Sequence, residues 1–234
     1  DKKHNNTIDF KNQPFLFYID NSNTWSNNFE YINKATEDIV KLLVENGCDV
    51  NKPDKSGIFP LEHAISNNNY AIVHALIETQ KIDFNQKIAN ETKNTYLHLA
   101  AYSRDSKILK AFIDLKVIDV NVKNSNNETP LMFACKKLLY KNVKILFEND
   151  NLDFHCKNNK NEDALQIVQK INPNESDILD NSFDSFTKEQ YLSTLISIIN
   201  EKRVLNPMEY DEDSDNIDGY YKYIERKPAL FIKS

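Results

Sequence analysis

The sequence predicts an all-α repeat solenoid, because two sets of residues recur at the same interval. Four leucines are spaced by 36, 34 and 34 residues: Leu61, Leu97, Leu131 and Leu165. Four aspartates in D-x-N or similar steps recur in phase with them: Asp49, Asp83, Asp119 and Asp153. Between the two sets, apolar residues such as Ile72, Val73 and Leu76 follow helical spacing. A period of this length is typical of stacked supersecondary units.

Each unit is expected to contain two helices followed by a turn. Pro60 and Pro130 lie where the first helix begins, because a missing N–H costs nothing there and φ is already helical. Thr95 and Thr129 come just before the first helix, where a hydroxyl can cap exposed amides. The Asp and Asn side chains of the D-x-N steps favour the turn that leads into the next unit.

These segments resemble the ankyrin repeat and its T-P-L-H-x-A motif. The matching stretches are GIFPLEHA (57–64), KNTYLHLA (93–100), NETPLMFA (127–134) and NEDALQIV (161–168). The resemblance implies a helix-turn-helix with a β-turn hairpin in each unit. The repeats are divergent, because only the third has both the threonine and the histidine, and the chain has 32 asparagines against 3 glycines.

About five units follow a short N-terminal extension at 1–11. They span 12–53, 54–87, 88–123, 124–157 and 158–202. Both terminal units are irregular, as expected for ends with one face in water. In the first unit, 12–20 is the expected first helix, and 36–51 contains the second helix and its exit turn. In the last unit, 172–186 interrupts the repeat before a second helix at 187–202.

Charge and composition narrow the function. The net charge is −6: residues 1–174 hold 22 acids and 22 bases and form a neutral body, whereas residues 175–218 hold 12 acids against 3 bases. The C-terminal tail at 203–234 is acidic and tyrosine-rich. This distribution argues against nucleic acid as a partner. No apolar run is long enough to span a membrane. Three scattered cysteines favour an intracellular protein with reduced thiols, and we expect it in the cytoplasm. Association with the cytoskeleton is an open alternative.

The sequence contains no pattern expected of an enzyme or of a metal or cofactor site. His98 is the best catalytic candidate, but the resemblance implies that histidine in this slot hydrogen-bonds backbone between adjacent repeats. His98, Thr95 and Thr129 are therefore expected to be structural. No histidines have ligand spacing, and no second pair completes a site with His155 and Cys156.

The resemblance implies that partners bind the hairpin tips and the exposed face of the first helices, which line a concave groove. Carried over by position, the candidate residues are Lys55, Ser56, Ile58, Ser66, Asn67, Glu91, Thr92, Tyr102, Ser103, Ser125, Asn126, Glu128, Lys136 and Lys137. Tyr102 is the best single anchor, because a rigid aromatic ring with a polar tip is favoured at contact hot spots. A second set could dock the tail on the repeats or on another chain: Tyr220, Tyr221, Tyr223, Leu230 and Phe231.

The expected function is a non-catalytic protein–protein interaction module that acts as a scaffold or adaptor. Two alternatives stay open at this point. The chain could be a structural subunit of a large cytoskeletal or axonemal assembly, or the regulatory ankyrin domain of a longer enzyme or channel chain. The fold alone does not decide among them, because function lies in the surface that the fold carries.

Overall fold

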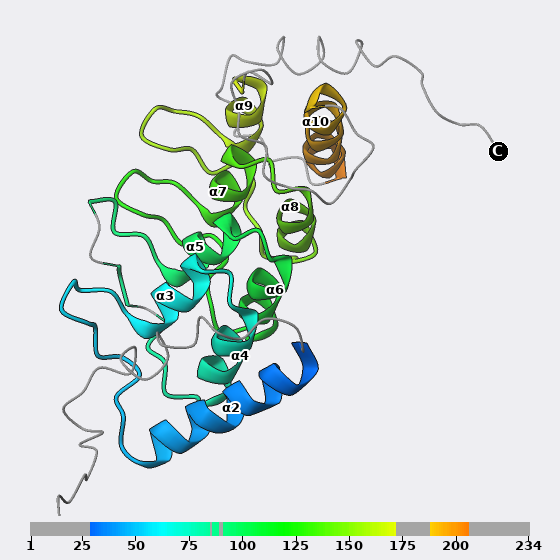
Figure 1. Cartoon of the computed structure of the whole chain (residues 1–234). Helices are drawn as coiled ribbons and strands as arrows, with labels where there is room; N and C mark the ends of the chain where they lie inside the picture. Colours follow the sequence, from blue (N-terminus) through cyan, green and yellow to red (C-terminus); the bar gives the residue numbers. More distant parts are fainter. Residues whose placement is uncertain (1–28, 85, 89–90, 172–187, 206–234) are drawn as a thin grey trace, which may run out of the picture.

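The computed structural model describes residues 29–84, 86–88, 91–171 and 188–205, which form two layers of helices (Figure 1). The inner layer contains α3 (Pro60–Ser66), α5 (Tyr96–Tyr102), α7 (Pro130–Lys136) and α9 (Ala164–Gln169). The outer layer contains α2 (Phe29–Glu45), α4 (Tyr70–Glu78), α6 (Ser106–Asp114), α8 (Tyr140–Phe147) and α10 (Lys188–Leu205). Within each layer every helix contacts the next. The predicted all-α repeat solenoid is therefore confirmed.

The inner helices begin where the sequence predicts. Pro60 and Pro130 are the first residues of α3 and α7. In three units the third helical residue also accepts a hydrogen bond from the backbone N–H of the residue that precedes the helix, as in a capping box. These bonds run from Phe59 to Glu62 Oε2 (3.3 Å), from Thr95 to His98 Nδ1 (3.2 Å) and from Asp163 to Gln166 Oε1 (3.0 Å). Three different side chains in the histidine slot thus satisfy the same donor.

The core lies along the seam between the layers. The four leucines of the repeat are at most 4% exposed, and Ala64, Ala100 and Ala134 are at most 2% exposed. A small side chain at the alanine position lets neighbouring helices approach closely, while outer-layer residues such as Leu76 and Leu109 fill the space between units. No single pair of helices could bury this much apolar surface, so each unit depends on its neighbours.

Left-handed backbone recurs at equivalent hairpin positions, although only one of them is glycine. The φ values are +80° at Gly57, +50° at Lys93, +56° at Asn127 and +60° at Asn161. Asparagine tolerates this region better than most residues with a Cβ, because its short polar side chain can bond locally. Asparagine therefore replaces glycine at two of these turns, which accounts for part of the scarcity of glycine.

The D-x-N steps join successive units as well as turning the chain. Asp119 accepts from the backbone N–H of Asn121 (2.9 Å), as expected of a turn residue. The Asn121 side chain then reaches the next unit, donating to the Asn151 carbonyl (2.7 Å) and accepting from Asp153 N–H (2.8 Å). Asn51 makes the equivalent pair of bonds two units earlier, from unit one to unit two. The sequence predicted the turns but not this cross-link.

The terminal units differ from prediction where the structure describes them. Helix α2 begins at Phe29, seven residues before the predicted start at 36, and it packs in the outer layer against α4. Helix α10 begins close to the predicted position but continues to Leu205. The helix expected at 12–20 lies outside the described residues, as does the interruption at 172–186.

Candidate binding surface

The inner helices and their hairpins form one continuous face, with the hairpins projecting from the side opposite the outer layer (Figure 1). Backbone hydrogen bonds join consecutive hairpins. Ser125 N–H donates to the Thr92 carbonyl (2.8 Å), and Asn159 N–H donates to the Asn126 carbonyl (2.9 Å). These bonds tie the hairpin tips of units three, four and five together, which favours a pre-organised face.

Most of the predicted contact residues reach solvent on this face. The exposed ones are Lys55, Ser56, Ser66, Asn67, Glu91, Tyr102, Ser125, Asn126 and Lys136. Ile58, Thr92 and Lys137 are half-buried. The structure therefore places twelve of the candidates where a ligand could touch at least part of the side chain.

The prediction was wrong for Ser103 and Glu128, which were expected on the exposed face but are only 6% and 8% exposed. The Ser103 hydroxyl donates to Asn68 Oδ1 in the preceding unit (2.8 Å), and its carbonyl accepts from Asn142 in the following one (2.8 Å). The Glu128 carboxylate accepts from Lys136 and Asn124. Ser103 is thus held between neighbouring units, whereas the Glu128 carboxylate is held by partners within its own unit, and assignment by position alone could not show this.

Tyr102 is the exposed member of an aromatic cluster that it forms with Phe133 and His98. It is 42% exposed, and its ring meets Phe133 of the next unit edge to face, with centroids 6.0 Å apart. Phe133 in turn contacts the His98 ring at 5.1 Å. The Lys137 ammonium lies 4.8 Å from the Tyr102 ring centroid, within the range of a cation–π contact. An anchor supported in this way presents a large surface at little cost in side-chain entropy.

His98 is fully buried, and its hydrogen bonds define its protonation state. Nδ1 accepts from Thr95 N–H (3.2 Å), so the proton lies on Nε2, which donates to the Glu128 carbonyl of the next unit (2.9 Å). Burial lowers the pKa of His98, and the bond to the Glu128 carbonyl only partly offsets this. The imidazole is therefore neutral and joins two units. Thr129 caps α7, accepting from Met132 N–H (3.4 Å).

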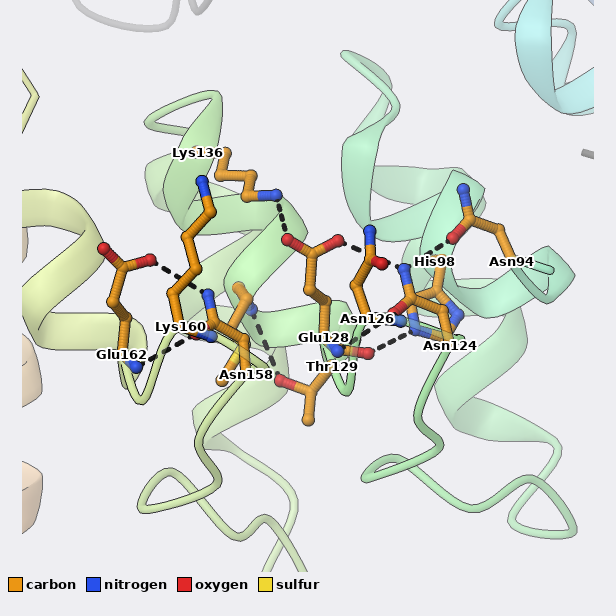
Figure 2. A network of polar contacts seen from close by, with 11 residues as sticks. Asn94, His98, Asn124, Asn126, Glu128, Thr129, Lys136, Asn158, Lys160 and Glu162 are labelled. Atoms are coloured by element: carbon orange, nitrogen blue, oxygen red, sulfur yellow. Dashed lines mark hydrogen bonds and ion pairs between the residues drawn. The ribbon is translucent and has the colours of Figure 1, made fainter. Parts of the chain in front are cut away.

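A polar network that sequence analysis did not identify runs beneath the hairpins (Figure 2). Asn124 Oδ1 accepts from the N–H groups of Asn126 and Glu128 (both 2.9 Å), and its amide donates to Glu128 Oε2 (3.1 Å) and to Asn94 Oδ1 of the preceding unit (2.9 Å). Lys136 pairs with the same Glu128 carboxylate. Burial alone would raise the pKa of Glu128, but the bonds from Lys136 and Asn124 hold it below its usual value.

The same network recurs 34 residues later. Asn158 bonds Lys160 N–H, Glu162 N–H and the Glu162 carboxylate, and Lys170 completes it at 2.6 Å. The sequence signal was available as N-x₃-E-x₇-K, which occurs at 124–136 and again at 158–170. Unit two has Asp54 in the asparagine position and Ile58 in the glutamate position. Its turn therefore forms around Asp54 Oδ1, without a glutamate beside it.

A surface cavity of about 290 Å³ opens where α5 turns toward the outer layer. The turns of units two and four pass through left-handed backbone at Asn68 and Leu138 (φ +52° and +55°). The unit-three turn instead extends at Ser103, with φ −71° and ψ 142°. The cavity lies beside this departure and includes Ser66, Tyr102, Ser103 and Lys137 from the predicted set.

Other features bear on the class of site. In the described part of the chain, no helix combines the length and the apolar character that crossing a membrane needs. Within the same residues, no group of three or more His, Cys, Asp or Glu side chains could hold a metal ion. The residues expected to dock the tail, Tyr220, Tyr221, Tyr223, Leu230 and Phe231, lie outside the described residues.

Stacked helix pairs joined by projecting turns define a helical repeat protein of the solenoid class. The family model described as "Ankyrin repeats (3 copies)" matches residues 31–88 and 82–159. The chain belongs to the ankyrin-repeat family, as the leucine and aspartate spacing predicted.

Three curated relatives illustrate the range of proteins that it resembles. Alpha-latrotoxin-Lg1a of Latrodectus geometricus is 31% identical over 103 residues, which cover 44% of this chain and 8% of the toxin. A probable serine/threonine-protein kinase of Dictyostelium discoideum is 32% identical over 129 residues, covering 52% and 15%. A putative ankyrin repeat protein of fowlpox virus is 27% identical over 215 residues, covering 86% and 58%. The chain thus spans less than two thirds of the length of each.

Proposed function

We propose that this chain is a non-catalytic protein-binding module, and that the face formed by α3, α5, α7, α9 and their hairpins binds the partner. Ankyrin repeats are protein-interaction modules, so the family supports the general function. The observation that carries the proposal is Tyr102, a half-exposed aromatic ring supported by Phe133 and Lys137 on the inner face. Aromatic residues in such settings carry a large share of interface energy.

A reducing, intracellular location is part of the proposal. All three cysteines of the chain, Cys48, Cys135 and Cys156, are free and buried. Burial raises the pKa of the Cys135 thiol far above its usual range and that of Cys156 to about 11. Thiols in this state resist oxidation and behave as small apolar side chains.

The test is affinity purification with quantitative mass spectrometry on two matched double variants. Tyr102→Ala with Lys137→Ala removes the aromatic anchor and the cation above it. Val117→Ala with Lys141→Ala makes a similar change at residues that are exposed outside this face. We expect the first variant to lose partners roughly tenfold or more, as for loss of a hot spot, and the second to retain them. Equal recovery by both variants would refute the proposed surface.

A second candidate function is the regulatory ankyrin portion of a longer protein. The short coverage of the relatives supports it, because the probable kinase and the toxin extend far beyond the matched residues. In that case the partner of the inner face could be another domain of the same polypeptide. Sequencing the complete transcript, then testing that domain for binding to the inner face, would separate this candidate from a free-standing adaptor.

A further inference from the structure

The cavity at the unit-three turn has a fixed shape, because polar bonds from both neighbouring units hold its rim. Asn68 Oδ1 accepts from the Ser103 hydroxyl (2.8 Å) and from Arg104 N–H (3.0 Å). On the other side, the buried amide of Asn142 donates to the carbonyls of Ser103 (2.8 Å) and Ala101 (3.0 Å). Such a pre-formed hollow can accept a ligand side chain without reorganising.

The lining of the cavity indicates what it would accept. Ile65, Leu99 and Leu139 supply apolar walls, and Arg104 and Lys137 supply two positive charges. Among the residues that the structure describes, no carboxylate lines the cavity and neither cation forms an ion pair. A complementary ligand therefore carries an apolar or aromatic side chain with carboxylates beside it.

The larger cavity on the outer layer makes a useful contrast. It measures about 470 Å³ and lies between α4 and α6. Lys107 and Lys110 line it together with Glu78 and Asp114, and Lys110 is already paired with Asp114 at 2.9 Å. Its charges balance locally, so it does not select a charged ligand as the unit-three cavity does.

We propose that residues 207–223 of this same chain bind the unit-three cavity, with a tyrosine ring between the apolar walls and carboxylates beside Arg104 and Lys137. This stretch has the required chemistry. Its carboxylates are Glu209, Asp211, Glu212, Asp213, Asp215 and Asp218, its aromatic residues are Tyr210, Tyr220, Tyr221 and Tyr223, and its one base is Lys222. Tyr210 lies between Glu209 and Asp211, and Tyr220 follows Asp218 by two residues, so a tyrosine and a carboxylate are close enough in sequence to meet both parts of the cavity.

The stretch is long enough to reach the cavity from the end of α10 at Leu205. Fifteen extended residues, as far as Tyr220, span about 50 Å at roughly 3.3 Å per residue. The last unit lies two packing steps from the third, each about 10 Å between helix axes. A tethered segment of this kind is present at an effective concentration near the millimolar range, so even a weak contact is well populated.

The inference rests on the proposed function, because the segment would cover Tyr102 and Lys137 on the partner-binding face. It adds a regulatory consequence, since a partner would have to displace the segment before it could bind. Neutralising the segment should therefore raise the affinity of the chain for ligands of the same face.

The experiment uses the full chain and a fluorescent peptide with the sequence of residues 207–223. In the neutralised chain the six carboxylates are replaced (E209Q, D211N, E212Q, D213N, D215N and D218N), which frees the cavity. We expect the neutralised chain to bind the peptide about tenfold or more tightly than the wild type. Adding Arg104→Ala and Lys137→Ala should reduce that affinity at least tenfold, whereas adding Lys141→Ala and Lys144→Ala, which removes the same charge from the outer helix α8, should not.

Several results would overturn the proposal. One is equal peptide affinity for the wild-type and neutralised chains, and another is no peptide binding by either. A third is an equal loss of peptide affinity when Arg104 and Lys137 are replaced and when Lys141 and Lys144 are replaced. Sedimentation velocity provides a further test, because a wild type that dimerises while the neutralised chain stays monomeric would show that the segment docks on a second copy. Specific peptide binding in a chain that captures no partner would refute the proposed function and leave this inference standing.

Discussion

Replacing Asn124 by alanine tests whether the network beneath the hairpins stabilises the array. The substitution removes four hydrogen bonds of 2.9–3.1 Å, to two backbone N–H groups, to the Glu128 carboxylate and to Asn94 in the preceding unit. At about 0.5–1.5 kcal/mol net for each bond, and with water able to reach the exposed Asn126, we expect a loss of about 2–4 kcal/mol. Asn124 is only 6% exposed, so its neighbours cannot all find water instead.

Asn158→Ala is the matched comparison, because it removes the equivalent bonds within its own hairpin. It loses three bonds, to Lys160, to Glu162 N–H and to the Glu162 carboxylate. We expect its cost to be smaller by about 1 kcal/mol, the net value of one hydrogen bond. Urea unfolding followed by circular dichroism at 222 nm measures both variants, and unchanged slopes would validate the comparison in a repeat array. A cost below about 0.5 kcal/mol for Asn124→Ala would refute the reasoning, as would a larger cost for Asn158→Ala.

Asn124→Asp refines the same prediction. It keeps the acceptor for the turn but places a second carboxylate beside Glu128, whereas Asp54 in unit two has the uncharged Ile58 in the position of Glu128. The aspartate variant should therefore be destabilised, and adding Glu128→Gln should recover part of the loss. A double-mutant cycle with no coupling between the two positions would show that the carboxylates do not interact.

Three further outcomes are expected. Burial lowers the pKa of His98 below its ordinary 6.5, so the unfolded chain takes up the proton first as the pH falls. The contribution of His98 to stability is complete above pH 6.5 and is lost as the pH drops through the folded pKa, so His98→Gln should make the urea midpoint less dependent on pH over this window, and an unchanged pH dependence would contradict this. Lys116→Gly should raise the free energy of unfolding by about 0.5–1 kcal/mol, because it relieves a φ of +53°. Gly57→Ala should lower it by about 1 kcal/mol because of its φ of +80°, although no atom lies within 4 Å of the new Cβ. Thermal melts in which the two signs were reversed would contradict this. Burial raises the pKa of the Cys135 thiol, so mass spectrometry should find it unmodified by iodoacetamide until the chain unfolds, and rapid native labelling would disprove its burial.

The fold was predictable because its signal is periodic. Leu61 and its three counterparts mark the core seam at a fixed interval, and Pro60 and Pro130 mark helix starts by a local steric rule. The start of α2 was not predictable in this way. Thr36 followed by acidic residues looks like an N-cap, but the residues before it, FEYINKA, contain no helix breaker and continue the helix from Phe29.

The binding face was predictable in outline but not in its buried members. Its position in the repeat predicted that Tyr102 is exposed on the inner face, and its side chain is 42% exposed. It could not show that Ser103 bonds Asn68 of the preceding unit, 35 residues away, or that the Glu128 carboxylate is enclosed by Asn124 and Lys136 of its own unit. Long-range bonds of this kind carry no local pattern, although the repeated N-x₃-E-x₇-K spacing was a readable clue.

The divergence of these repeats follows a chemical rule. Glu62, His98 and Gln166 differ in size and charge, yet each offers an acceptor to the same helix-start N–H. Asn127 and Asn161 replace glycine where the backbone is left-handed. In three of the four units the histidine slot thus retains a hydrogen-bond acceptor, Met132 being the exception, and the turn position retains its backbone conformation while the side chain changes. A surface carried on such a scaffold can change its ligand freely, provided that the acceptors and turns beneath it are kept.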